Sequence, residues 1–231
     1  MKMHDLVVLL CGVIEASAII IASVSVYFLS SSLQRKYKTS FSSYGNEDHN
    51  IDDLIRRANN EIYIIANCGD TLFKDHKNTF IKCLKRGVKI NALILDKNTF
   101  PAMDRYVSGT GLLNKVKISL QILNEFKNEY KNQITLRESS EIFTQSYICI
   151  DIDKPTPIDE WSRNCIIQVM LYQFMTPTKK SAIAYFYPAK DEKEFGTTVK
   201  SIHQLWNNSK ELKVEEYINF IDSRELDYFE A

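Results

Sequence analysis

The order of hydrophobic and polar positions divides the chain near residue 30. Residues 6–29 read LVVLLCGVIEASAIIIASVSVYFL and contain one ionisable group, Glu15. As a helix this stretch is roughly 36 Å long at about 1.5 Å per residue, against a hydrocarbon core of about 30 Å. The pattern predicts a retained transmembrane helix. A cleavable signal peptide is less favoured, because the apolar run is about twice a usual signal core and only Lys2 supplies a preceding basic charge.

The basic residues around this segment predict its orientation. Arg35, Lys36 and Lys38 follow the span, whereas Lys2 stands alone before it. The positive-inside rule therefore places the C-terminal part of the chain in the cytoplasm. Residues 30–50 are rich in Ser, Lys, Asn and Tyr and have no sustained apolar period, so we interpret them as a linker.

Beyond the linker, apolar runs of helical and strand length alternate. The 3.6-residue period predicts helices at 51–60, 74–87, 112–131 and 192–212. Short β-rich runs predict strands at 61–68, 89–96, 134–139, 146–153, 165–174 and 181–189. Helices separate the strands of the first half, while the second half is typical of an antiparallel meander. We therefore expect an α/β domain over 51–212, with a mixed β-sheet flanked by helices. Residues 213–231 form an acidic, aromatic tail that we expect to dock on this domain, with a partner-binding peptide as the alternative.

Small and polar residues recur at spacings of four and three along one face of the predicted membrane helix. This stripe consists of Cys11, Glu15, Ala18, Ala22 and Ser25. A carboxyl group in hydrocarbon is costly unless it is protonated or has a partner, and small residues allow helices to approach closely. The stripe predicts self-association. A protonated Glu15 tolerated in a single anchor is the alternative.

Composition and charge exclude several classes of protein. The 231 residues are 45% hydrophobic and 25% charged, which excludes a disordered chain and a collagen-like fibre. The formal net charge is zero, so nucleic-acid binding through a global basic field is not supported. One local basic stretch could hold an anionic ligand or form a solvated helix face. It contains Lys74, Lys77, Lys85, Arg86 and Lys89.

The cysteines favour a reducing compartment. Outside the predicted span lie Cys68, Cys83, Cys149 and Cys165, with no CxxC pair and no His spacing suited to zinc. We expect reduced thiols, no disulfide framework, no metal and no cofactor.

Polar residues follow two of the predicted strands. Asn67 and Asp70 come after the first strand, and Asp96 ends the second. Ligands of α/β sheets tend to bind beyond the carboxyl ends of strands. These three residues are therefore candidates for a ligand pocket.

Several phrases resemble the phospholipase D-like superfamily. They are I-x-x-L-I-x-x-A-x-x-E-I-Y-I-I at 51–65, F-I-K-C-L-K-R-G-V-K-I-N-A-L-I-L-D at 80–96 and V-K-S-I-H-Q-L-W at 199–206. The resemblance covers about 51–212. It implies cleavage of phosphodiesters by two motifs, HxKxxxxD and a following GSxN. In the first motif the His attacks phosphorus and the Asp tunes the catalytic network. The Lys of the first motif and the Asn of the second hold the phosphate oxygens.

This chain departs from that motif at its reactive positions. In the register Thr144-Gln-Ser146-Tyr-Ile-Cys-Ile-Asp151, Thr144 replaces the His and Ser146 replaces the Lys, while Asp151 keeps its spacing. Trp-Ser-Arg-Asn164 loosely matches GSxN. The chain therefore lacks both cationic residues of the motif, one of which, the His, is also the nucleophile. Hydrolysis by the family's route is not expected. The four histidines lie elsewhere: His4, His49, His76 and His203, with His76 expected on a solvated helix face.

Taken together, the resemblance and the membrane segment predict a membrane-anchored, non-catalytic phospholipase D-like domain. Such a domain would act as a ligand sensor or a signalling or defence effector, with a phosphorylated ligand or a protein as partner. Relatives with one motif per chain imply a homodimer, and a larger homo-oligomer is the alternative. Two alternatives stay open, a divergent phosphodiesterase (nuclease or phospholipase) and a protein-binding membrane scaffold.

Overall fold

The computed structural model describes residues 42–43, 50–99, 111–152, 165–171 and 182–229. Its first half contains β1 (Ser42–Ser43), α2 (Ile51–Arg56), β2 (Glu61–Ala66), α3 (Asp70–Asp75), α4 (Lys77–Lys85), β3 (Lys89–Leu95) and α6 (Leu112–Glu129). The second half contains β4 (Ile134–Ser139), β5 (Gln145–Ile150), β6 (Ile166–Leu171), β7 (Ala182–Phe186), α7 (Glu192–Asn208), β8 (Lys210–Glu211) and α8 (Val214–Phe229).

The strands form one mixed sheet in the order β1-β7-β6-β5-β2-β3-β4-β8. Strands β2, β3 and β4 are parallel, because helices connect them on one side of the sheet. Strands β5, β6 and β7 are an antiparallel meander that joins this parallel half through the β2–β5 pair. The predicted α/β fold, with a mixed sheet flanked by helices, is confirmed.

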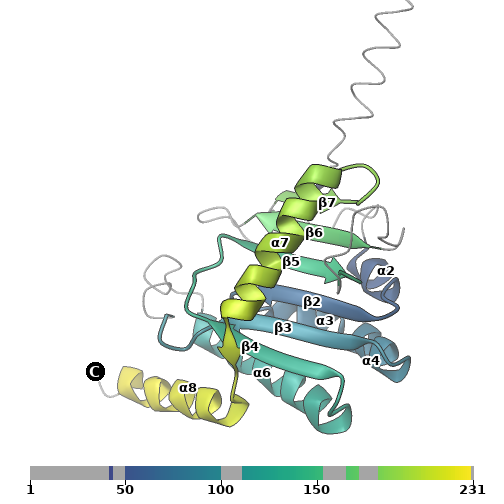
Figure 1. Cartoon of the computed structure of the whole chain (residues 1–231). Helices are drawn as coiled ribbons and strands as arrows, with labels where there is room; N and C mark the ends of the chain where they lie inside the picture. Colours follow the sequence, from purple (N-terminus) through teal and green to yellow (C-terminus); the bar gives the residue numbers. More distant parts are fainter. Residues whose placement is uncertain (1–41, 44–49, 100–110, 153–164, 172–181, 230–231) are drawn as a thin grey trace, which may run out of the picture. The chain divides into compact units, whose positions relative to one another are not determined.

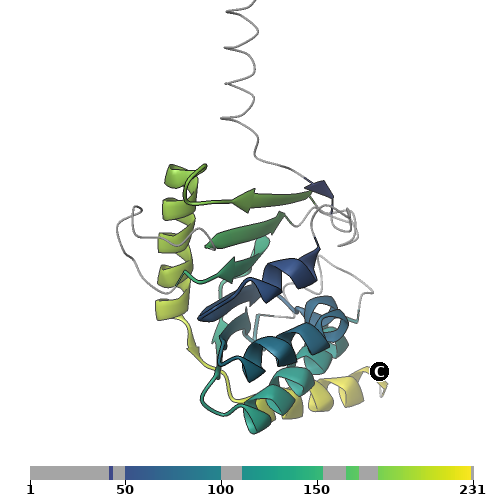
Figure 2. The same ribbon diagram turned by 90° about the vertical axis from the view of Figure 1, so that its right-hand side faces the viewer.

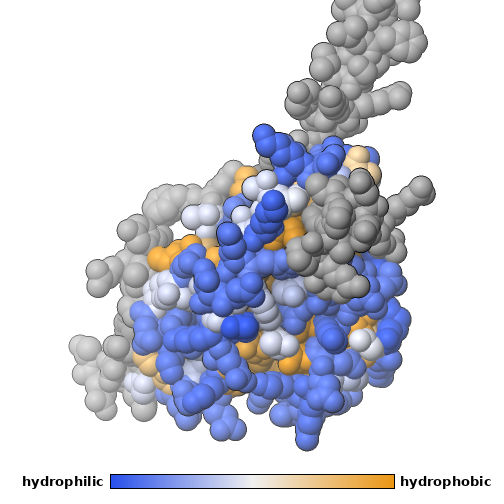
Figure 3. Space-filling model, in the orientation of Figure 1, coloured by the Kyte–Doolittle hydropathy of each residue, from blue (hydrophilic) through white to orange (hydrophobic). Residues whose placement is uncertain are grey.

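Helices cover both faces of the sheet. Helix α7 lies across one face, and α2, α3, α4 and α6 lie on the other, as Figures 1 and 2 show. The two faces have separate apolar cores, because successive side chains of a strand point to opposite sides. Ile64 packs in the core under α2 and α3, and its neighbour Ile65 packs under α7. Figure 3 shows the α7 side as mostly hydrophilic, with small hydrophobic areas beside the helix.

The apolar period places the longest helix correctly. Val116, Leu120 and Leu123 of α6 face the sheet and are fully buried, as their spacing predicts. The expected helix at 74–87 is instead divided at His76, whose backbone leaves the helical region and separates α3 from α4. His76 is also not a solvated residue, because its Nδ1 lies 3.0 Å from a carboxylate oxygen of Asp52.

The C-terminal segment packs on the domain as α8. Val214, Tyr217 and Ile221 are buried in the core that contains α6, and the Tyr217 hydroxyl donates a hydrogen bond to the Leu95 carbonyl at 2.5 Å. Lys117 of α6 pairs with Asp222 at 2.6 Å. The hydrophobic core therefore continues beyond residue 212.

Within the described part of the chain, no helix is long and apolar enough to cross a bilayer. The predicted span at 6–29, and with it the stripe of Cys11, Glu15, Ala18, Ala22 and Ser25, lies outside the described residues.

Candidate functional site

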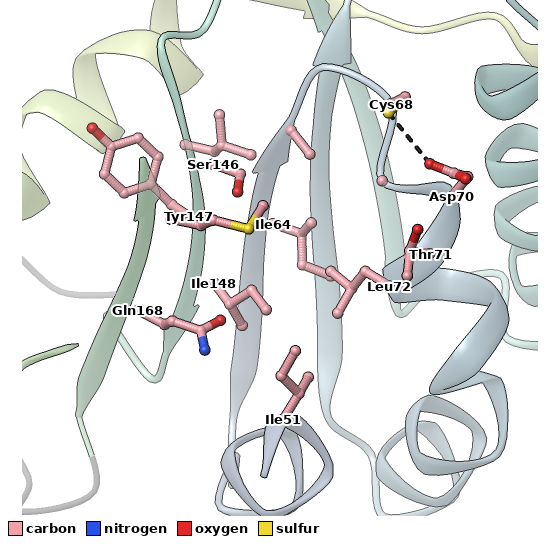
Figure 4. Close-up of a pocket in the computed structure, with 14 residues that line it drawn as sticks. Ile51, Ile64, Cys68, Asp70, Thr71, Leu72, Ser146, Tyr147, Ile148 and Gln168 are labelled. Atoms are coloured by element: carbon pink, nitrogen blue, oxygen red, sulfur yellow. Dashed lines mark hydrogen bonds between the residues drawn. The ribbon is translucent and has the colours of Figure 1, made fainter. Parts of the chain in front are cut away.

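A pocket opens where β2 ends, on the face of the sheet that carries α2 and α3. Its described lining comes from the first residue of α2, from β2, the following turn, the start of α3, and strands β5 and β6 (Figure 4). The cavity offers about 80 Å³ to the centres of water-sized molecules. Because one water needs about 10–15 Å³ of such space, several waters or one small ligand fit.

The turn that shapes the pocket depends on Gly69. Its φ of +73° lies in the left-handed region, and an added Cβ would approach Phe73 to 2.9 Å. Phe73 is fully buried beneath the turn, so its ring fixes the path of the backbone. The turn then places Asp70 and Thr71 at the pocket wall.

The polar groups of the pocket are few, and none of its described lining residues is Lys, Arg or His. Asp70 accepts a hydrogen bond from the Cys68 thiol at 3.4 Å, at the rim of the pocket (Figure 4). Burial, together with the Asp70 charge, raises the pKa of Cys68 to about 12. The thiol therefore stays protonated at neutral pH and is a poor nucleophile.

Gln168 is a buried polar group that β6 brings to this pocket. It is only 3% exposed, and it lies directly opposite Ile148 in the β5–β6 register. Its amide nitrogen donates to the Tyr185 hydroxyl at 2.7 Å, and Figure 4 shows its oxygen directed toward the interior of the pocket. Sequence reasoning did not identify Gln168. The signal was present, because Gln168 is the one polar residue in the apolar run 165–171.

The four motif positions are not gathered at one site. Ser146 lines the pocket, whereas Thr144 is exposed and is not part of the described lining. Asp151 follows the far end of β5, roughly 17 Å from Ser146 at about 3.4 Å per residue. Asn164 lies outside the described residues.

Asp151 holds the start of β2 in place. Its carboxylate accepts hydrogen bonds from the backbone N–H groups of Asn59, Asn60 and Glu61, with the closest approach to each between 2.8 and 3.0 Å. The residue is 7% exposed and has a φ of +54°, a conformation that Asp tolerates better than most residues. These contacts give Asp151 a structural role between β5 and β2.

The candidate Asn67 is also a brace. Its amide nitrogen donates to the Phe143 carbonyl at 2.9 Å, and its amide oxygen accepts from the Phe143 N–H at 3.2 Å. This reciprocal pair fastens the end of β2 to the segment before β5. Asn67 is 2% exposed and is not among the described residues that line the pocket.

The candidate Asp96 belongs to a different cluster, at the ends of β3 and β4. Lys210 of β8 lies 2.7 Å from Asp96 and 3.3 Å from Glu138. Burial raises the pKa of Glu138, and the neighbouring Asp96 charge adds to this effect. Although burial opposes it, hydrogen bonds from Lys210 and the Asn98 N–H lower the pKa of Asp96. Asp96 and Asp70 therefore do not share one site.

The basic stretch is partly engaged within the protein. Lys77 pairs with Glu125, and the Arg86 guanidinium donates to the carbonyls of Arg56 and Ala58. Among the described residues, no three His, Cys, Asp or Glu side chains are grouped to hold a metal ion.

No protein-family model matches the sequence, and no curated protein sequence matches it. Among solved structures, the chain is similar to the archaeal chromatin protein TrmBL2 at 15% identity and a TM-score of 0.46, covering 86% of this chain and 64% of that one. It is also similar to Nuc, a phospholipase D family member of Salmonella typhimurium, at 16% identity and a TM-score of 0.44. This match covers 75% of this chain and 98% of Nuc. A third similar structure is phosphatidylserine synthase of Haemophilus influenzae Rd KW20, at 13% identity and a TM-score of 0.46. This match covers 78% of this chain and 41% of the synthase. At these TM-scores the similarity carries no argument about activity or ligands.

Proposed function

We propose that this chain is a membrane-anchored, non-hydrolytic phospholipase D-like protein that binds a small ligand and acts as a sensor or as a signalling or defence effector. The observation that carries the proposal is the pocket beside Ser146. Its described lining has no histidine to attack phosphorus and no cation to hold phosphate oxygens.

The chemistry of phosphoryl transfer makes these losses decisive. Charge on the phosphate oxygens needs preorganised cationic or N–H donors, and the attacking group needs a base or a lowered pKa. Ser146 has no described His or Lys at the pocket wall, and the protonated Cys68 is no substitute. The remaining family position, Asp151, is committed to backbone N–H groups.

The test is product formation by the purified full-length chain in detergent. Nucleic acids, cyclic nucleotides and phospholipids are offered, and products are identified by mass spectrometry. We expect no product above that of the Ser146→Ala variant. Product formed by the natural chain and abolished by Ser146→Ala would replace the proposal with a divergent phosphodiesterase.

The anchor and the oligomeric state are part of the same proposal. The apolar segment 6–29 anchors the chain, and its stripe around Glu15 joins two or more copies. We expect Glu15→Leu to reduce the particle to a monomer in detergent, measured by light scattering, and Ile20→Leu on the opposite helix face to leave it unchanged. An unchanged size for Glu15→Leu contradicts this part of the proposal.

A further inference from the structure

We propose that the pocket selects a small ligand with an apolar body and a hydrogen-bond-donating head group that carries no negative charge, such as an amine. This inference rests on the proposed function, and it specifies the ligand of the same site. It also departs from the phosphorylated ligand that the family resemblance implies.

The first argument is the charge of the pocket. Asp70 is the one Asp, Glu, Lys, Arg or His side chain among the described lining residues, and burial together with its charge raises the pKa of the Cys68 thiol to about 12. Within the described residues, no Lys, Arg or His lies within ion-pair distance of Asp70. Among the described lining residues an anion entering the pocket would meet this carboxylate and no cationic side chain, whereas a cation would be attracted to the carboxylate.

The second argument is the set of hydrogen-bonding atoms. The Gln168 amide nitrogen donates one of its two hydrogens to the Tyr185 hydroxyl, and the amide oxygen is an acceptor that faces the cavity. The hydroxyls of Ser146 and Thr71 can accept as well as donate. The Asp70 carboxylate at the rim can only accept hydrogen bonds. A ligand that donates hydrogen bonds can pair with this carboxylate and with the Gln168 oxygen, whereas an acceptor-only ligand can pair with neither.

The third argument is the apolar character of the remaining wall. Ile51, Ile64, Leu72, Ile148 and Met170 surround the polar groups. Figure 4 shows Ile51, Ile64, Leu72 and Ile148 around the same space as Gln168. Such walls favour a hydrophobic body of limited size, with the polar atoms fixing its orientation.

The experiment compares three probes of nearly equal shape. Benzylamine, benzyl alcohol and benzoate share one ring and differ in head-group charge. Each is titrated against the full-length chain in detergent, and dissociation constants are obtained by ligand-observed nuclear magnetic resonance. We expect benzylamine to bind most tightly and benzoate to bind at least about fivefold more weakly, the range of a partly exposed charge pair.

Two matched variants assign the effect to the pocket. Asp70→Asn removes the rim charge, and we expect the benzylamine and benzoate constants to converge to within about twofold. Asp75→Asn removes an exposed carboxylate of the same helix that is not in the described lining, and it should leave the ratio unchanged. Both variants are checked for an unchanged circular dichroism spectrum.

Three results overturn the inference: no binding of any probe, binding of benzoate as tight as that of benzylamine, or an unchanged ratio in Asp70→Asn. Each leaves the non-hydrolytic part of the proposed function untouched, because that part is tested by phosphodiester turnover. Turnover abolished by Ser146→Ala refutes the proposed function instead.

Discussion

Replacement of Asp151 by Ala tests whether this motif position is structural. In the superfamily that the sequence resembles, the Asp at this spacing belongs to the catalytic motif, whereas here its carboxylate accepts hydrogen bonds from three backbone N–H groups at the start of β2. The Ala variant leaves those donors unpaired in a part of the chain where Asp151 is 7% exposed. It also places a residue with a Cβ but no local hydrogen bond in a left-handed conformation.

The expected loss of stability is about 4 kcal/mol. A hydrogen bond to a charged group contributes about 1.5–3 kcal/mol. The three bonds share one carboxylate and are not additive, so about 3 kcal/mol is expected for the set. The left-handed backbone adds about 1 kcal/mol for Ala. Asp151→Asn keeps one acceptor oxygen and tolerates this conformation, so its cost is about 1–2 kcal/mol.

The free energy of unfolding is measured by urea titration of the full-length chain in detergent, followed by far-ultraviolet circular dichroism. Asp53→Ala is the control, because Asp53 is 60% exposed and its ion-pair partner among the described residues, Arg56, is itself about half exposed. Its effect should be within about 0.5 kcal/mol. A loss below about 1 kcal/mol for Asp151→Ala refutes the structural role.

Three further predictions concern stability, each measured by urea titration. Lys210→Ala should cost about 2 kcal/mol at pH 7, because two buried carboxylates lose their partner. Because burial raises the pKa of Glu138, this carboxyl takes up a proton as the pH falls toward 4 and then no longer needs a cationic partner. The cost of Lys210→Ala should therefore be smaller near pH 4 than at pH 7. An equal cost at both pH values contradicts the proposed cluster of Lys210 with the two carboxylates. Gly69→Ala should cost about 2 kcal/mol or more, because the added Cβ meets the Phe73 ring. Gly87→Ala should cost about 1 kcal/mol, because it has the same left-handed backbone but no neighbour near the added Cβ. Equal costs for the two variants contradict the contact with Phe73. Tyr217→Phe should cost about 1–2 kcal/mol through the lost bond to β3, and a neutral result contradicts its role in holding α8.

The fold was predictable where local periodicity and burial agree. The helix α6 and the strands β2 to β7 follow apolar patterns that extend over five residues or more, and those patterns reflect burial in the two cores on either face of the sheet. The division at His76 was not predictable from periodicity, because the apolar positions on either side keep helical spacing. What decides it is the contact with Asp52, 24 residues away in sequence.

The site was predictable only in part, because its polar residues are distinguished by their partners. Asn67 and Asp70 both follow β2, yet Asn67 is bound to Phe143, 76 residues away, while Asp70 reaches the pocket. Asp151 keeps a family spacing, but its partners lie about 90 residues earlier in the chain. Spacing along the sequence therefore identified the ends of the strands and could not separate structural from ligand-facing groups.

The central claim is that the pocket beside Ser146 does not hydrolyse phosphodiesters. Its most direct test is release of 4-nitrophenolate from bis(4-nitrophenyl) phosphate by the full-length chain, followed by absorbance beside the Ser146→Ala variant. We expect equal rates for the two proteins, at the level of buffer alone. A rate above buffer for the natural chain that falls to the buffer level in Ser146→Ala contradicts the central claim.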